Sequence, residues 1–444
     1  MCGRPIRQTR VMRLRTERMY FIVERLFVVS AILFFMGAII PLLRNPGHVT
    51  AEIQASDSLT VVLQLAIYET ALLFMIPNRG RLLEAFAQNP VLCSLLLLIL
   101  FSTLWSPVPS FTLRRAIWFM LTTGFGLYLA TRFDIKEQIR LVTYALAICV
   151  FLSVVFIVAL PRYGVDIAMY HGAWRGVFFH KNSLGCYMVV ATITFLCFRP
   201  ETVRELVVKY LGLALSLCLL IGSVAKGAYV TMLISILLIF LYRLLRIPWK
   251  RLIPMATVTL FILGIAAAYV ASNAELFLRM LGKDASLTGR IPMWTTVLAI
   301  SSSRRWLGFG FAGFWATNSH AVWSILAWKP AKAHNGFIDL LVDLGWVGMG
   351  MFALNTVMAF WRCMKLAARK HTMEAQWPLL MLSLILVYNL FETDLMQVHS
   401  FFWVAYVTIT ASTQRAWSLS RTAAPAMAQK TPQLATTGYE PCPQ

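Results

Sequence analysis

Charged residues and metal-binding patterns are scarce in this chain of 444 residues. Only 13% of the residues are Asp, Glu, Lys or Arg, whereas 59% are hydrophobic. A soluble domain of this length could not bury so much apolar surface. The eight cysteines include no CxxC pair and no Cys/His metal spacing, so neither a disulfide framework nor a zinc site is indicated.

Long continuous apolar runs take up most of the sequence. Runs near 18 residues or longer recur along the chain, which is typical of membrane-crossing α-helices, whereas barrel strands would alternate apolar and polar residues. The sequence predicts an all-α, polytopic integral membrane protein with about twelve transmembrane helices. The predicted spans are 26–43, 59–76, 91–105, 116–131, 141–160, 184–198, 207–222, 227–242, 253–271, 336–361, 377–391 and 399–413.

The Lys and Arg residues predict the orientation. If the N-terminus is cytoplasmic, 26 of the 40 Lys and Arg fall on the cytoplasmic side, and cytoplasmic segments of membrane proteins are rich in these residues. Twelve spans also require both termini on one side. The net charge of +21 therefore does not indicate nucleic-acid binding, because the basic residues lie in short clusters between apolar runs.

These boundaries divide the chain into three parts. A basic cytoplasmic segment, 1–25, precedes the first span, and the lack of a small-residue cleavage site predicts that this span is not removed as a signal peptide. The membrane domain is 26–413, with one long outer loop, 272–335, between spans nine and ten. The segment 414–444 is rich in Ala, Thr, Pro and Gln and is expected to be a disordered cytoplasmic tail.

Several cationic groups fall on the outer side, against the general bias. They are Arg114, Arg115, Arg175, His180, Lys181, Lys226 and Arg290. One interpretation is that these side chains extend to phospholipid headgroups. The alternative is an anion site, since Arg binds phosphate oxygens through two N–H groups and Lys adds charge. The few outer acids form no DxD motif, so we expect no metal, and cationic side chains would have to stabilise a diphosphate.

The tenth span begins with an imidazole and carries two acids. His334 lies where the outer loop meets the helix start, whose partial positive charge favours a neutral imidazole that can accept a proton. It could equally be an interfacial residue that caps the helix. Asp339 and Asp343, four residues apart, share one helical face. Asp339 could orient His334 or bind a sugar hydroxyl, or both acids could pair with cations of a neighbouring span.

Several segments, in order, resemble the O-antigen ligase and Wzy-type polymerase family, and in particular its exopolysaccharide polymerases. The His334-Asn335 pair, followed by Gly345 and Gly348, fits the family's His-[Asn/Ser/Gln]-x9-Gly-x2-[Gly/Thr/Tyr] pattern. The earlier segments are TGRIPMW (288–294), LGFGFAGF (307–314), RGVFFHKNSLG (175–185) and WSPVPSFTLRR (105–115). The resemblance covers roughly residues 100–395. The two acids of the tenth span are not both accounted for by the family pattern.

The resemblance implies a glycan substrate on undecaprenyl diphosphate, handled at the periplasmic face of a bacterial inner membrane without metal or cofactor. It implies that His334 deprotonates the acceptor hydroxyl and that Arg290 binds the leaving diphosphate. Arg175 is a weaker match to a second arginine of the family. We expect His180, Lys181, Asn182, Arg114, Arg115, Lys226, Asn335 and Asp339 to contribute to substrate binding. The expected partners are the growing polysaccharide acceptor, the lipid bilayer, and candidate chain-length regulator and flippase proteins.

Four functions compete for this pattern. The first is polymerisation of exopolysaccharide repeat units, and the second is ligation of the glycan to lipid A core or protein. Because no acceptor motif is present, the sequence separates these two poorly. A secondary transporter or flippase would place polar groups near the midplane between related halves, which the sequence does not show. A scaffold for polysaccharide export would not depend on His334 or Arg290.

Overall fold

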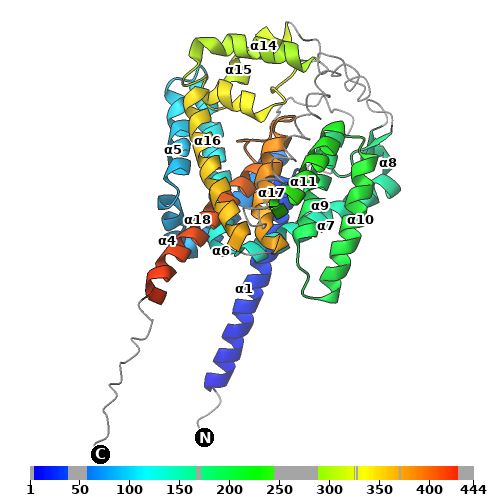
Figure 1. Ribbon diagram of the computed structural model, residues 1–444, viewed down its shortest axis with the longest axis vertical. Coiled ribbons are helices and arrows are strands. Elements are labelled where there is room, and N and C mark those ends of the chain that lie inside the picture. Colours follow the sequence, from blue (N-terminus) through cyan, green and yellow to red (C-terminus); the bar gives the residue numbers. More distant parts are fainter. Residues whose placement is uncertain are drawn as a thin grey trace, which may run out of the picture.

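A computed structural model describes residues 5–38, 58–166, 172–244, 289–324, 326, 329–369 and 372–428. In these ranges the chain is a bundle of α-helices (Figure 1). The elements are α1 (Pro5–Phe35), α3 (Ser58–Met75), η2 (Ile76–Asn78), α4 (Arg79–Ala87), α5 (Pro90–Phe101), η3 (Ser102–Leu104), α6 (Pro109–Arg132), α7 (Ile135–Ala159), α8 (Pro161–Gly164), β1 (Val165–Asp166), β2 (Ala173–Trp174), α9 (Lys181–Cys197), α10 (Val203–Gly222), α11 (Lys226–Leu244), α14 (Arg290–Ser301), η4 (Ser302–Arg304), α15 (Gly313–Trp323), α16 (Gly336–Arg369), α17 (Met373–Tyr388) and α18 (Phe401–Ala428).

The helices correspond to the predicted apolar runs. Eleven of the twelve predicted spans overlap a helix, and the ninth, 253–271, lies outside the described residues, as does 272–288 of the long loop. Among the described residues, four helices are long and apolar enough to cross a membrane: Val61–Ala87, Ile135–Ala159, Val203–Gly222 and Gly336–Arg369. Four more apolar helices are shorter. The all-α prediction is confirmed, whereas the count of twelve spans stays a prediction.

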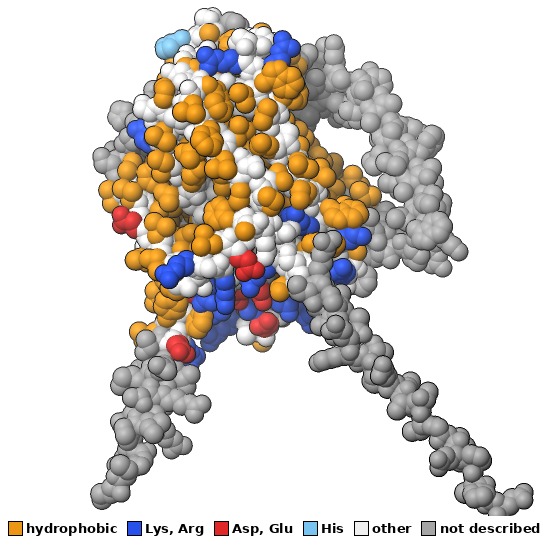
Figure 2. All heavy atoms as spheres, turned by 90° about the vertical axis from the view of Figure 1, so that its left-hand side faces the viewer, with side chains coloured by type: hydrophobic (Ala, Val, Ile, Leu, Met, Phe, Trp, Pro, Cys, Tyr) orange, Lys and Arg blue, Asp and Glu red, His pale blue; other side chains and the backbone are white. Residues whose placement is uncertain are grey.

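The surface supports a membrane location. Figure 2 shows a broad band of hydrophobic side chains, with Lys, Arg, Asp and Glu gathered below it and further Lys and Arg near the upper tip. Such a band is larger than the apolar patches of soluble monomers. We call the two ends the upper and lower ends, as in Figure 1. α18 continues to Ala428 and therefore extends into the segment predicted as a disordered tail.

Packing in the bundle centres on α9 and α18. α9 packs against α7, α10, α11 and α17, and α18 packs along α6. The approach of α18 to α6 depends on Gly126, because a Cβ there would lie 2.9 Å from Cβ of Val407. Trp403, on α18, is fully buried and packs against Phe119 of α6 in a tilted arrangement, with 4.7 Å between ring centroids. These contacts therefore hold α6 and α18, which are distant in sequence, close together.

Two helices cover the upper end of the bundle. Figure 1 shows α14 and α15 lying across it, above the start of α16. The helix α14 belongs to the long loop 272–335 and contacts α16.

Helix α16 is broken at Gly345, where φ is 64° and ψ is −167°. The N–H of Trp346 donates to the Arg305 carbonyl (2.9 Å), and the N–H of Val347 donates to Trp306 (3.1 Å). A Cβ at Gly345 would lie 2.2 Å from the Trp306 carbonyl oxygen. Gly345 therefore allows the backbone turn at Trp306 to approach the break in α16 closely.

Candidate active site

The carboxylate of Glu392 lies at the centre of a polar cluster at the upper end. Its Oε2 lies 2.9 Å from Nδ1 of His334, and its Oε1 lies 3.5 Å from Nη2 of Arg290. The side-chain amide of Asn182 also donates to Oε1, at 3.0 Å. Four separate segments meet here: the start of α9, the start of α14, the residues before α16, and the loop after α17. The side chains of Arg290, His334 and Glu392 are only 14–18% exposed.

Arg290 is fixed by the way α14 begins. Gly289 precedes it with φ of 82°, a left-handed conformation that glycine adopts without steric cost. The guanidinium donates through Nη1 to the Phe391 carbonyl, and the same nitrogen lies 3.5 Å from the His334 carbonyl. One helical turn along, the indole of Trp294 donates to the Ala333 carbonyl at 2.8 Å. Arg290 is therefore held against the segment that carries His334.

His334 has a strained backbone, with φ of 48°. For a residue other than glycine, such a conformation costs on the order of 1–3 kcal/mol and persists only where neighbours enforce it. The cap of α16 is the side chain of Asn335, which accepts from the N–H groups of Phe337 (3.0 Å) and Ile338 (3.2 Å). The alternative that His334 caps this helix is therefore wrong.

Gly336 lies where the segment that carries His334 contacts the loop after α17. Its N–H donates to the carbonyls of Asn389 (2.8 Å) and Glu392 (3.2 Å). A Cβ at this position would lie 2.5 Å from Oδ1 of Asn389. The glycine therefore allows the loop that carries Glu392 to reach the backbone next to His334.

The electrostatics favour an ionised Glu392. Burial, the largest effect, opposes ionisation, but the hydrogen bond from His334 and the charges of His334, Lys332 and Arg290 outweigh it and lower the pKa of Glu392 to about 2. Glu392 therefore presents an ionised carboxylate oxygen to Nδ1 of His334, 2.9 Å away.

The two acids of α16 bind backbone and side-chain donors in its surroundings. Asp339 is 4% exposed and accepts from Trp315, Ala333 and Thr393. Asp343 accepts from the N–H groups of Ala312 (2.9 Å) and Phe314 (3.3 Å) at the start of α15. In the contacts described, Glu392 rather than Asp339 contacts the imidazole of His334. A part for Asp339 in sugar binding stays a prediction.

Two of the other predicted site residues lie beside the cluster. His180 caps α9, its Nδ1 accepting from the N–H of Asn182 at 3.1 Å. Burial lowers the pKa of His180, and the charge of Glu392 opposes this effect. Burial and the nearby Lys226 lower the pKa of Lys181, whose ammonium lies 3.4 Å from the Val224 carbonyl. Lys181 and Lys226 therefore form a pair of like charges.

Three predicted arginines are engaged elsewhere. The guanidinium of Arg175 donates to the carbonyls of Tyr163 (2.8 Å) and Arg162 (3.3 Å). The guanidinium groups of Arg114 and Arg115 lie over the ring of Phe111, with 5.6 and 5.8 Å to its centroid. No contact described here joins these three residues to Glu392, and their part in substrate binding stays a prediction.

Sequence reasoning gave no role to Glu392 or Thr393. Both lie in FETDLMQVHS (391–400), a polar interruption between two apolar runs. An acid in such a short connection, on the same predicted side as His334, was the available signal. Within the ranges the structure describes, no group of three or more His, Cys, Asp or Glu side chains is placed to hold a metal ion.

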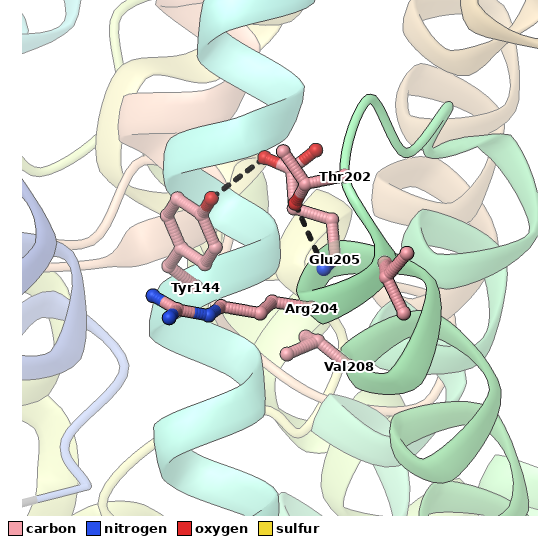
Figure 3. Close-up of a pocket in the computed structure, with 6 residues that line it drawn as sticks. Tyr144, Thr202, Arg204, Glu205 and Val208 are labelled. Carbon is pink, nitrogen blue, oxygen red and sulfur yellow. Dashed lines mark hydrogen bonds between the residues drawn. The ribbon is translucent and has the colours of Figure 1, made fainter.

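A pocket of about 640 Å³ lies at the other end of the molecule, at the start of α10. Figure 3 shows Tyr144 donating to Glu205 across it and Thr202 accepting from the Glu205 N–H (2.7 and 3.2 Å). Helix α9 begins at the cluster around Glu392, which includes Asn182, and ends at Cys197, shortly before this pocket. Its 17 residues span about 25 Å, which separates the cluster from the pocket. The pocket is therefore distinct from the cluster around Glu392.

The apolar helices and the polar cluster at one end are those of a multi-pass α-helical membrane protein. A family model described as O-antigen ligase matches residues 211–353. The chain is also 24% identical, over 317 residues, to the exopolysaccharide production protein ExoQ of Rhizobium meliloti (strain 1021), covering 68% of this chain and 71% of that protein. These matches confirm the resemblance to the O-antigen ligase and Wzy-type polymerase family. The family match includes Arg290 and His334 but not Asn182 or Glu392.

Proposed function

We propose that the protein polymerises undecaprenyl-diphosphate-linked oligosaccharide repeat units into exopolysaccharide at the periplasmic face of the bacterial inner membrane. The observation that carries the proposal is the shared carboxylate of Glu392, which brings the imidazole of His334 and the guanidinium of Arg290 into one cluster. A glycosyl transfer from a lipid diphosphate needs a proton acceptor and a cation next to each other. The family match and the similarity to an exopolysaccharide production protein support the proposed substrate class.

In the proposed reaction, His334 is the general base. Its Nδ1 faces Glu392, so we assign proton acceptance from the acceptor hydroxyl to Nε2. The acceptor oxygen forms a bond to the anomeric carbon as the bond from that carbon to the diphosphate breaks, and a single displacement of this kind inverts the anomeric centre. Glu392 stabilises the imidazolium that results. A positioned base contributes on the order of 10²–10⁴ in rate.

Arg290 would stabilise the leaving group. The electron pair of the broken bond stays on the departing diphosphate, whose negative charge grows in the transition state. In the resting protein Arg290 is balanced by Glu392 over 3.5 Å, a contact long enough for diphosphate oxygens to compete with it. By analogy with oxyanion-hole donors, such a cation contributes on the order of 2–4 kcal/mol. No metal is needed in this scheme, and Arg175 remains a second proposed diphosphate ligand.

The direct test uses purified protein in lipid nanodiscs with a synthetic polyprenyl-diphosphate repeat unit. Wild-type protein should lengthen the glycan with EDTA present and without any ion gradient. His334→Ala and Arg290→Ala should each lose polymer formation while the protein stays folded. Matched controls are the exposed His320→Ala on α15 and Arg305→Ala at the turn before it, both expected to keep activity. Full activity of His334→Ala would refute the proposed mechanism.

A ligase is the second candidate function, because the family model carries that description. The products in a deletion strain separate the two. Loss of long chains, with single repeat units retained on lipid, supports polymerisation. Normal long chains that stay attached to the lipid carrier would exclude polymerisation and support transfer to another acceptor.

A further inference from the structure

Asp339 accepts hydrogen bonds from both segments that build the His334–Glu392 contact. Its two oxygens each lie 3.1 Å from the N–H of Ala333, the residue before His334. Its Oδ2 accepts from the hydroxyl of Thr393 at 2.6 Å, and Thr393 directly follows Glu392. Its Oδ1 also accepts from the indole of Trp315 on α15, at 2.7 Å. One carboxylate therefore connects the neighbours of both members of the pair.

The hydroxyl of Thr393 completes this arrangement. It donates to Asp339 and accepts from the backbone N–H of Asn335, the residue after His334, at 3.1 Å. The N–H groups on either side of His334 are thus held by two hydrogen-bonded partners. Thr393 is fully buried and Asp339 nearly so.

The backbone of His334 needs such support. Its φ of 48° lies in a region that residues other than glycine leave unless the surroundings hold them there. If Ala333 or Asn335 were released, His334 could relax toward a negative φ. Its imidazole would then turn away from Glu392, and the 2.9 Å contact between them would be lost.

We propose that Asp339 and Thr393 act together as a positioning pair that keeps His334 in its strained backbone conformation against Glu392. This inference rests on the proposed function, in which His334 is the general base. The pair touches neither substrate nor the reacting atoms. It sets the geometry of the base through backbone hydrogen bonds, whereas Glu392 contacts the imidazole itself.

Two variants at Thr393 test the pair. Thr393→Val keeps the volume and removes the hydroxyl, whereas Thr393→Ser keeps the hydroxyl. In the nanodisc assay we expect Thr393→Val to lower kcat by about 10- to 100-fold, as supporting hydrogen-bond partners of a site do, with a much smaller change in KM for the lipid-diphosphate donor. Thr393→Ser should retain kcat within about threefold. The pH dependence of kcat should shift in the valine variant, because His334 no longer faces Glu392.

Asp339→Asn offers a second test with a matched control on the same helix. The amide replaces one acceptor oxygen by a donor, which cannot bind the N–H of Ala333, the hydroxyl of Thr393 or the indole of Trp315 in the same way. We expect it to reproduce the kcat loss of Thr393→Val. Asp343→Asn, one turn further along and bonded only to the start of α15 in the contacts described, should leave kcat within about threefold.

The outcomes separate this inference from the proposed function. Valine and serine variants with equal kcat and unchanged pH profiles, in a protein where His334→Ala is inactive, would overturn the positioning pair and leave the base assignment intact. An active His334→Ala would overturn the base assignment itself, whatever the variants at 339 and 393 do. Loss of activity in step with lost thermal stability in all four variants would also overturn the positioning role.

Discussion

The buried carboxylates at the two ends of the bundle have different kinds of partner. At the lower end, Glu24 is fully buried and bound by Arg132 through two hydrogen bonds, of 2.8 and 2.7 Å, while the hydroxyl of Tyr128 donates to it at 2.6 Å. At the upper end, Glu392 is shared by an imidazole, a guanidinium at 3.5 Å and an amide. The lower carboxylate is saturated by one fixed cation. The upper one is shared between an imidazole at 2.9 Å and a guanidinium whose hydrogen bonds go to backbone carbonyls instead.

A second lower cluster repeats the saturated pattern. Arg140 bridges Glu201 (2.6 Å) and Glu205 (3.0 Å), and Glu205 also accepts from Tyr144. Figure 2 shows Lys, Arg, Asp and Glu side chains concentrated below the hydrophobic band. An arginine that binds carboxylate oxygens through two nitrogens holds them in a fixed geometry. Such contacts connect helices α1, α6, α7 and α10. A proton transfer or an incoming anion needs groups that can change partners, and those lie at the upper end.

The largest expected effect is a loss of stability when the charge pair at the lower end is broken. Arg132→Gln leaves Glu24 buried without its cation, which should lower the free energy of unfolding by about 3 kcal/mol. Arg132 is 19% exposed, so water offsets part of the loss. Denaturation in nanodiscs followed by tryptophan fluorescence gives the value, and kcat of the folded fraction should not change. The double variant Glu24→Gln, Arg132→Met should recover most of the stability, and a failure to recover would contradict the assignment of the loss to an unpaired charge.

Glu392→Gln should have the second largest effect, and on activity. The amide keeps the shape but no longer stabilises the imidazolium of His334, so we expect kcat to fall by about 10²-fold, within the range that positioned acid–base groups contribute. Polymer formation by purified protein is the measurement. The lower-end Glu205→Gln is the matched control and should retain kcat. Equal losses in both variants would remove the functional contrast between the two ends.

A smaller effect is expected from Tyr144→Phe at the pocket of Figure 3. This variant removes the 2.7 Å hydrogen bond to Glu205 and little volume. A hydrogen bond to a charged group contributes about 1.5–3 kcal/mol, and partial exposure of this site places the expected loss of stability near 1 kcal/mol. Thermal unfolding measures it. A loss of polymerisation without a loss of stability would contradict the expectation that the lower pocket has only a structural role.

A pH-dependent effect is expected on the acid stability of the upper end. The folded-state pKa of Glu392, about 2, lies below its ordinary value of 4.5. A lowered carboxylate pKa stabilises the fold fully above the ordinary value, and the contribution is lost as the pH falls through the folded value. The stability difference between wild type and Glu392→Gln should therefore shrink between pH 4.5 and pH 2. A difference that stays constant over this window would contradict an ionised Glu392.

Much of the helical fold, and part of the site, could be predicted from the sequence. Apolar runs placed eleven helices, because a stretch that must be solvated by lipid has to satisfy its backbone hydrogen bonds internally. The motif order brought Arg290 and His334 into one candidate site. Their neighbours were assigned less well: the acid facing the imidazole is Glu392, 58 residues from His334, and not Asp339, five residues away.

The sequence by itself determined that this protein is an apolar helical bundle with cations and an imidazole at helix ends, since hydropathy and charge act locally along the chain. Only the tertiary structure decided which ends meet. Gly336 lets the loop after α17 approach the start of α16, and Gly345 lets a backbone turn approach the break in that helix. Asp339 accepts hydrogen bonds from Ala333 and Thr393. The choice of hydrogen-bond partner in a buried site depends on which backbones can approach closely, and that is a property of packing rather than of local sequence.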